Sequence, residues 1–133
     1  IIKSIDNFVL NNSKIAISVK SLGYENYISL LKFVDIVVGN SSSGIIEAPF
    51  LGTYTLNIGN RQNGRVFSDS IINCKDNHKS IYINLKKLIE KSNKPYIKKS
   101  IFYKPNSVNK VCKIIKSIKL DNILKKKFYK IKY

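Results

Sequence analysis

Three consecutive serines, Ser41, Ser42 and Ser43, stand between an apolar run at residues 36–38 and a segment with the spacing of a helix. The first N–H groups of a helix lack intrahelical partners and lie at the positive end of the helix dipole. Small hydroxyl side chains, followed here by Gly44, let an anion approach such N–H groups closely. The serine loop (residues 40–43) therefore predicts a seat for a phosphate-bearing ligand. The alternative is that a serine only caps an ordinary helix.

Both arginines of the chain, Arg61 and Arg65, fall in one polar stretch, the arginine loop (residues 59–65), whereas the other 22 basic residues are lysines. A planar guanidinium binds phosphate or carboxylate through two parallel hydrogen bonds, which an ammonium group cannot do. Arginine at only these positions indicates a contact with an anionic ligand, and the pattern favours Arg61 over Arg65. The alternative is a structural ion pair with Glu47 or Asp69.

Glu47 lies four residues after Ser43, one turn along the same face of the predicted helix. A carboxylate would repel an anion that it touched directly. It is better suited to accept hydrogen bonds from neutral hydroxyls beside the anion, such as a ribose diol. A surface glutamate or an arginine partner is the alternative interpretation.

The elements that must position these side chains alternate along the chain. Helical spacing predicts helices over residues 1–11, 24–33, 43–51, 78–92 and 108–118. Short apolar runs predict strands over residues 14–20, 35–39, 53–58 and 71–72. Such alternation predicts an α/β fold with a Rossmann-like parallel sheet and flanking helices, in which ligands bind at the C-terminal ends of strands. Because the serine and arginine loops follow successive strands, both are expected to open on the same edge.

Composition limits the partners of the 133-residue chain, which is long enough for one domain with its own core. Its net charge of +16 is uneven, with +1 over residues 1–74 and +15 over residues 75–133. Isoleucine, lysine and asparagine, which have AT-rich codons, make up 59 residues, and the lysines are dispersed. These features favour a solvated surface, with no nucleic-acid or membrane partner, over a basic binding face.

Other signals are sparse. No stretch has the length of a membrane-spanning helix, and no signal-peptide pattern is present. Cys74 and Cys112 lack metal-ligand spacing and are expected to be reduced, buried thiols of a cytoplasmic protein. His78, the only histidine, is expected to be a surface or capping residue. We expect no metal and no cofactor.

The motifs resemble one family. Asn40-Ser41-Ser42-Ser43-Gly44 with Glu47, followed by the arginine loop, is similar to the UDP-N-acetylglucosamine 2-epimerases, and closest to their hydrolysing branch. The resemblance is strong over residues 20–74, weak to about residue 118, and absent from the tail. One departure is Asn106, which stands in a segment where the family carries glycines, and which can adopt their left-handed conformation.

The resemblance implies that residues 1–118 are the C-terminal, nucleotide-binding half of a two-domain GT-B-like fold whose N-terminal domain is missing, and that residues 119–133 form a basic tail. It also implies a cytoplasmic enzyme that is a homo-oligomer at full length. Ser41, Ser42, Ser43 and Gly44 would hold the UDP of a UDP-sugar substrate. Glu47 would hold the ribose, and Arg61 would lie near the diphosphate or uridine.

The implied reaction eliminates UDP across C1–C2 of a UDP-amino sugar, after which water adds with inversion at C2 and gives an N-acetylmannosamine-type sugar for the biosynthesis of sialic-acid-like sugars. The acid and base groups of the family map to no residue here, so this chain is expected to bind nucleotide without catalysing the reaction alone. Two alternatives remain open: an inactive nucleotide-binding module, and the donor domain of a GT-B glycosyltransferase.

Overall fold

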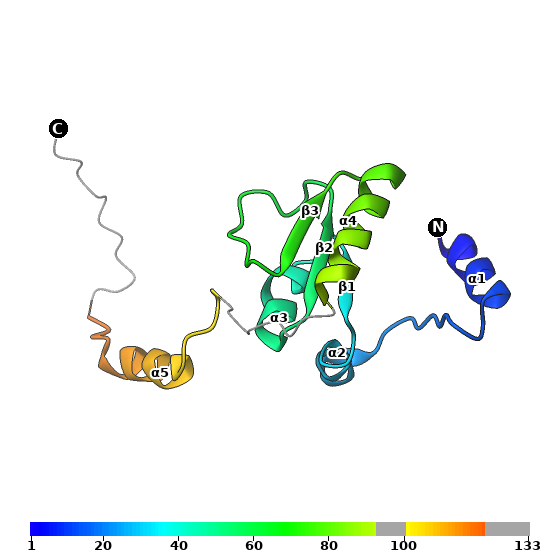
Figure 1. Ribbon diagram of the computed structural model, residues 1–133. Helices are drawn as coiled ribbons and strands as arrows, with labels where there is room; N and C mark the ends of the chain where they lie inside the picture. The colour runs from blue at the N-terminus through cyan, green and yellow to red at the C-terminus, as the bar shows by residue number, and fades with distance from the viewer. Residues whose placement is uncertain (93–100, 122–133) are drawn as a thin grey trace. The chain divides into compact units, whose positions relative to one another are not determined.

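The computed structural model describes residues 1–92 and 101–121, and the chain divides into two compact units. The first unit is Ile1–Phe102, and the second begins at Tyr103. The first unit contains a three-stranded parallel sheet in the order β1-β2-β3 (Figure 1). Its strands are β1 (Ile36–Gly39), β2 (Tyr54–Ile58) and β3 (Ile71–Cys74). The predicted α/β class with a Rossmann-like parallel sheet is therefore confirmed.

Two helices cover opposite faces of this sheet. The Thr55 hydroxyl donates a 2.7 Å hydrogen bond to the Gly44 carbonyl of α3 (Ser43–Leu51). The next residue, Leu56, packs in a buried cluster with Leu88 of α4 (His78–Ser92). Since successive side chains of a strand point to opposite faces, α3 covers one face and α4 the other.

The core of the first unit lies between the sheet and α4. Tyr54, Leu56, Cys74 and Leu88 form the buried cluster, and partly buried isoleucines from all three strands pack against it. The face under α3 is different, because buried polar side chains such as Thr55 and Asn57 stand there on β2. The amide nitrogen of Asn57 has a partner, since Nδ2 donates a 2.7 Å hydrogen bond to Asn73 Oδ1 of β3.

Three further helices agree with the predicted segments. They are α1 (Ile2–Asn11), α2 (Gly23–Leu31) and α5 (Ser107–Ser117). In the second unit, α5 follows Asn106, whose φ of 60° is left-handed, so the expectation for this residue is confirmed. The longest helix of the described residues, α4, has 15 residues, and none of these helices is both long and apolar enough to cross a bilayer.

The strand predicted over residues 14–20 is wrong, because the chain there forms a turn followed by irregular backbone. Ile15 and Ile17 are 84% and 86% exposed. Their alternation with small or polar residues fits a strand, but a strand also needs a neighbour to pair its backbone N–H and C=O groups. Within the described residues the sheet contains only β1, β2 and β3, and none of them pairs with this segment.

Candidate functional site

The serine loop connects the C-terminal end of β1 to the start of α3. Ser42 occupies the N-cap position, but its side chain makes no capping hydrogen bond. The N–H groups of Ser43 and Gly44 donate only long bonds, 3.3 Å to the Ser41 hydroxyl and 3.2 Å to the Ser41 carbonyl. A phosphate oxygen would offer these N–H groups a charged acceptor, which makes shorter and stronger hydrogen bonds. The Ser41 hydroxyl thus gives the start of α3 only a long side-chain hydrogen bond, and an anion could replace it.

Gly44 has a packing role that the sequence did not reveal. A Cβ built on it would lie 2.7 Å from Cγ2 of Thr55, which is too close for any real contact. The absence of a side chain thus lets the first turn of α3 lie directly on β2. This requirement holds whether or not an anion approaches the loop.

The arginine loop reaches the serine loop, as expected for loops that follow adjacent parallel strands. Nη1 of Arg61 lies 3.3 Å from the carbonyl oxygen of Asn40 and 3.5 Å from its Oδ1. Nε2 of Gln62 donates a shorter bond, 2.8 Å, to the same carbonyl. The prediction that the two loops open on one edge is confirmed, and Asn40 is the point where they meet. Arg65 is exposed.

Glu47 lies one turn into α3, with its side chain partly buried. Its Oε2 is buried and has no hydrogen-bond partner in the described part of the chain. The alternative that an arginine neutralises this oxygen is therefore not seen. A buried carboxylate oxygen without a donor is unfavourable unless something supplies one. Neutral hydroxyls of a ligand would do so.

Tyr27 of α2 contacts the site, although its spacing predicted only a helix face. Its hydroxyl donates a 2.8 Å hydrogen bond to the Ser43 hydroxyl and so ties α2 to the start of α3. Tyr27 also lines a hollow of about 410 Å³. The other residues around this hollow are Val19, Ser21, Leu22, Gly23 and Tyr24. Two of the lining residues, Tyr24 and Tyr27, are aromatic, and the Tyr27 hydroxyl links the hollow to Ser43 of the serine loop.

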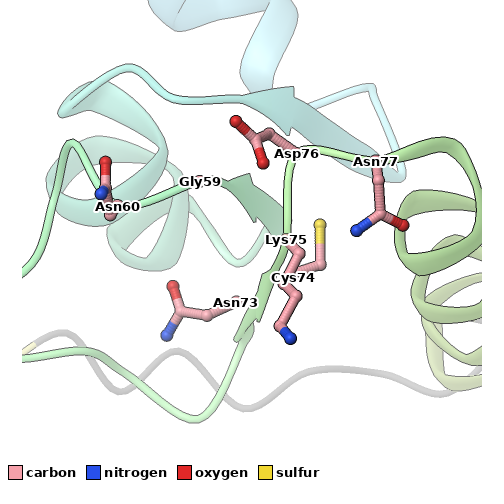
Figure 2. Close-up of a pocket in the computed structure, with 7 residues that line it drawn as sticks. All are labelled: Gly59, Asn60, Asn73, Cys74, Lys75, Asp76 and Asn77. Carbon is pink, nitrogen blue, oxygen red and sulfur yellow. The ribbon is translucent and has the colours of Figure 1, made fainter.

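A second hollow, of about 460 Å³, lies at the C-terminal ends of β2 and β3 (Figure 2). It is lined by Gly59, Asn60, Asn73, Cys74, Lys75, Asp76 and Asn77. Its two charged residues, Lys75 and Asp76, have opposite signs, and Figure 2 shows them pointing in different directions. A lining without net charge gives an anion little reason to bind.

Other polar residues have structural roles. The Asn77 side chain, and not that of His78, caps α4 by accepting a 2.9 Å hydrogen bond from the Ser80 N–H. His78 is exposed and stacks on Tyr82, with ring centroids 6.3 Å apart, so its predicted surface role is confirmed. Nowhere among the described residues do three or more His, Cys, Asp or Glu side chains gather as metal ligands would.

The two cysteines should differ in reactivity. Cys74 is buried, as predicted, but the prediction is wrong for Cys112, which is exposed because α5 buries none of its residues. Burial raises the pKa of the Cys74 thiol above its ordinary value of 9.0, which lowers the fraction of reactive thiolate. We expect a disulfide reagent to label the exposed Cys112 much faster than Cys74 in the native chain. Fast labelling of the native Cys112→Ser variant would contradict the buried position of Cys74.

The raised pKa of Cys74 also determines how the stability of the fold changes with pH. Between pH 9.0 and the raised pKa of Cys74, the unfolded chain has lost the thiol proton while the folded chain keeps it. The stability contributed by this group is thus complete below pH 9.0 and is lost as the pH rises toward the folded-state pKa.

Comparison with known proteins places the chain in a family. The model of the family described as UDP-N-acetylglucosamine 2-epimerase matches residues 2–116. A relative from Campylobacter jejuni, named GDP/UDP-N,N'-diacetylbacillosamine 2-epimerase (hydrolyzing), is 35% identical over 93% of this chain and 33% of its own length. The polysialic acid biosynthesis protein P7 of Escherichia coli is 36% identical over 84% of this chain and 29% of its own length. A Legionella pneumophila relative, named UDP-N,N'-diacetylbacillosamine 2-epimerase (hydrolyzing), is 35% identical over 78% of this chain and 27% of its own length.

The chain thus spans about a third or less of the length of these relatives. The matched region includes the sheet, the serine loop, Glu47 and the arginine loop. Since the family model covers most of its residues, this chain belongs to the UDP-N-acetylglucosamine 2-epimerase family.

Proposed function

We propose that this chain is the UDP-binding part of a hydrolysing 2-epimerase that acts on a UDP-amino sugar. The observation that carries the proposal is the meeting of the two loops at the Asn40 carbonyl. This contact brings the guanidinium of Arg61 to the loop that precedes the N-terminus of α3. A cation and a helix N-terminus on one sheet edge form a site for a diphosphate.

The remaining parts of UDP fit the groups around this seat. The diphosphate would accept hydrogen bonds from the backbone and hydroxyls of Ser41, Ser42 and Ser43, and from Arg61. The ribose hydroxyls would donate to Glu47, whose Oε2 has no partner within the described residues. The uracil would lie in the hollow beside Tyr27, where the hydrogen bond to Ser43 holds the ring next to the serine loop.

In the proposed reaction these residues bind the leaving group. Elimination of UDP places negative charge on the diphosphate as the bond to the sugar breaks. Hydrogen-bond donors of the serine loop, and the Arg61 guanidinium once it contacts the phosphates, would stabilise the charge as it develops. None of the residues assigned here is suited to remove the C2 proton, because Glu47 is committed to the ribose and His78 lies on the surface. We therefore propose that the chain binds UDP but needs the remainder of the enzyme for turnover.

Titration of the chain with nucleotides tests the site. We expect UDP to bind more tightly than UMP, and UMP more tightly than uridine, because each phosphate adds contacts with the serine loop and Arg61. ADP should bind more weakly than UDP if the hollow beside Tyr27 selects the smaller base. Calorimetry, or chemical shifts of the residue 41–47 amides, would measure these affinities. A folded chain that binds neither UDP nor UMP would overturn the proposed nucleotide site.

The two arginines provide a matched comparison. We expect Arg61→Ala to weaken UDP binding by about 1–3 kcal/mol, the usual effect of removing a charged hydrogen-bond partner. Arg65→Ala removes the same charge from the same loop, but the hydrogen bonds to Asn40 come from Arg61 and Gln62. Arg65→Ala should therefore weaken UDP binding by less than half as much as Arg61→Ala. Its effect on the affinity should vanish at high salt, which screens the long-range attraction. Equal losses at both positions would mean that only net charge matters.

A further inference from the structure

Gln62 differs from its neighbours in the arginine loop. It is 4% exposed, whereas Asn60, Arg61, Asn63 and Arg65 are all exposed. Its Nε2 donates the shortest of the three hydrogen bonds that join the arginine loop to Asn40. The loop also turns around this residue, since the Arg65 N–H donates to the Gln62 carbonyl at 3.3 Å. Gln62 is thus the buried anchor of an otherwise solvated loop.

The orientation of its amide follows from chemistry. The Asn40 carbonyl can only accept a hydrogen bond, so the Gln62 atom that faces it must be the nitrogen. The Oε1 atom is then left buried, without a partner in the described part of the chain. A buried acceptor without a donor is unfavourable, so the fold gains little from Gln62 beyond its bond to Asn40. Together with the burial of Gln62 in an otherwise exposed loop, this indicates a role at the contact with Asn40.

The Asn40 carbonyl is shared unequally. The Gln62 nitrogen lies 2.8 Å from it and the Arg61 nitrogen 3.3 Å. If Gln62 satisfies the carbonyl, Arg61 can leave it without exposing an unpaired acceptor. If Gln62 cannot donate, Arg61 is the one side-chain donor left on this carbonyl within the described residues, and releasing Arg61 becomes unfavourable.

We propose that Gln62 is a positioning residue that fixes the Asn40 carbonyl and so releases the Arg61 guanidinium for the phosphates of the ligand. The inference rests on the proposed UDP site. Gln62 would not touch the ligand; it would fix the end of the serine loop and keep the Arg61 guanidinium available.

The test uses Gln62→Met, which keeps the length of the side chain and removes its donor, with the exposed neighbour changed in Asn63→Met as the control. Without ligand, hydrogen exchange at the amides of residues 43–46 should quicken about tenfold in Gln62→Met, as expected when one hydrogen bond is lost. Exchange in α4 should not change. Asn63→Met should match the parent chain at both places. Unchanged exchange at residues 43–46 in Gln62→Met would overturn the inference.

Binding measurements distinguish the positioning role from a merely structural one, which would not change the affinities for UDP and uridine differently. Gln62→Met should weaken UDP binding about tenfold and change uridine binding less than twofold, because uridine has no phosphate for Arg61 to contact. In an Arg61→Ala background, Gln62→Met should cost less than twofold further, since its effect passes through Arg61. Equal losses for UDP and uridine, or losses that multiply in the double variant, would overturn it. A parent chain that fails to bind UDP would refute the nucleotide site, while the exchange measurement would still decide the positioning role.

Discussion

Gly44→Ala should destabilise the chain by about 1–3 kcal/mol, the usual cost of forcing an extra methyl group into a packed interior. The new Cβ would lie 2.7 Å from Cγ2 of Thr55, which is 2% exposed. Thr55 cannot rotate away without losing the 2.7 Å hydrogen bond from its hydroxyl to the Gly44 carbonyl. Helix propensity predicts the opposite sign, because alanine in place of glycine within a helix normally stabilises by about 0.5–1 kcal/mol. The steric overlap should outweigh the gain in helix propensity. Urea denaturation of the parent chain and Gly44→Ala would measure the difference in their free energies of unfolding.

A second substitution tests whether the overlap is the cause. Thr55→Ser removes Cγ2 but keeps the hydroxyl that bonds to Gly44. Gly44→Ala made in the Thr55→Ser background should therefore cost much less than in the parent chain, and the coupling of the two positions should be about 1 kcal/mol or more. If Gly44→Ala is neutral in the parent chain, or if the two effects simply add, the close approach of α3 to β2 is not what requires glycine.

Local patterns predicted most elements of the first unit because each needs little beyond its own residues. The apolar run before Asn40 forms β1, and the helical spacing after it forms α3 at Ser43–Leu51, the predicted range. Parallel strands then leave the serine loop and Arg61 on one edge, since the C-terminal ends of such strands lie together. The fold of the site thus follows from periodicity and connectivity.

The errors and omissions involve contacts between distant residues. The segment around Ile15 and Ile17 has strand-like alternation, yet a strand forms only when a neighbour pairs with it. Tyr27 and Gln62 were not predicted as site residues, because their roles depend on hydrogen bonds to Ser43 and Asn40, 16 and 22 residues away. No local pattern encodes those contacts. The single buried side chain of a polar loop is visible only in three dimensions.

Glu47→Ala is the second substitution with a large expected effect. Its effects on the stability of the free chain and on UDP binding should have opposite signs. In the free chain its Oε2 is buried without a donor within the described residues, which penalises the folded state. Glu47→Ala should therefore leave the free energy of unfolding unchanged or raise it. The same substitution removes the acceptor proposed for the ribose hydroxyls. We expect it to weaken UDP binding by about 1.5–3 kcal/mol, the range for hydrogen bonds to a charged group.

A ligand that lacks the diol separates the ribose role from a general loss of negative charge. For 2',3'-dideoxy-UDP, the parent chain and Glu47→Ala should bind equally, because neither complex contains the hydroxyl–carboxylate contact. Glu90→Ala, which removes an exposed glutamate from α4, should leave the affinity for both ligands unchanged. Two results would refute the assignment: a Glu47→Ala chain that binds UDP as tightly as the parent, or one that loses the same factor with the dideoxy ligand. A marked loss of stability in Glu47→Ala would instead mean that the carboxylate supports the fold. A carboxylate whose role is to bind the ligand finds its hydrogen-bond donors only in the complex, so its removal should not destabilise the free chain.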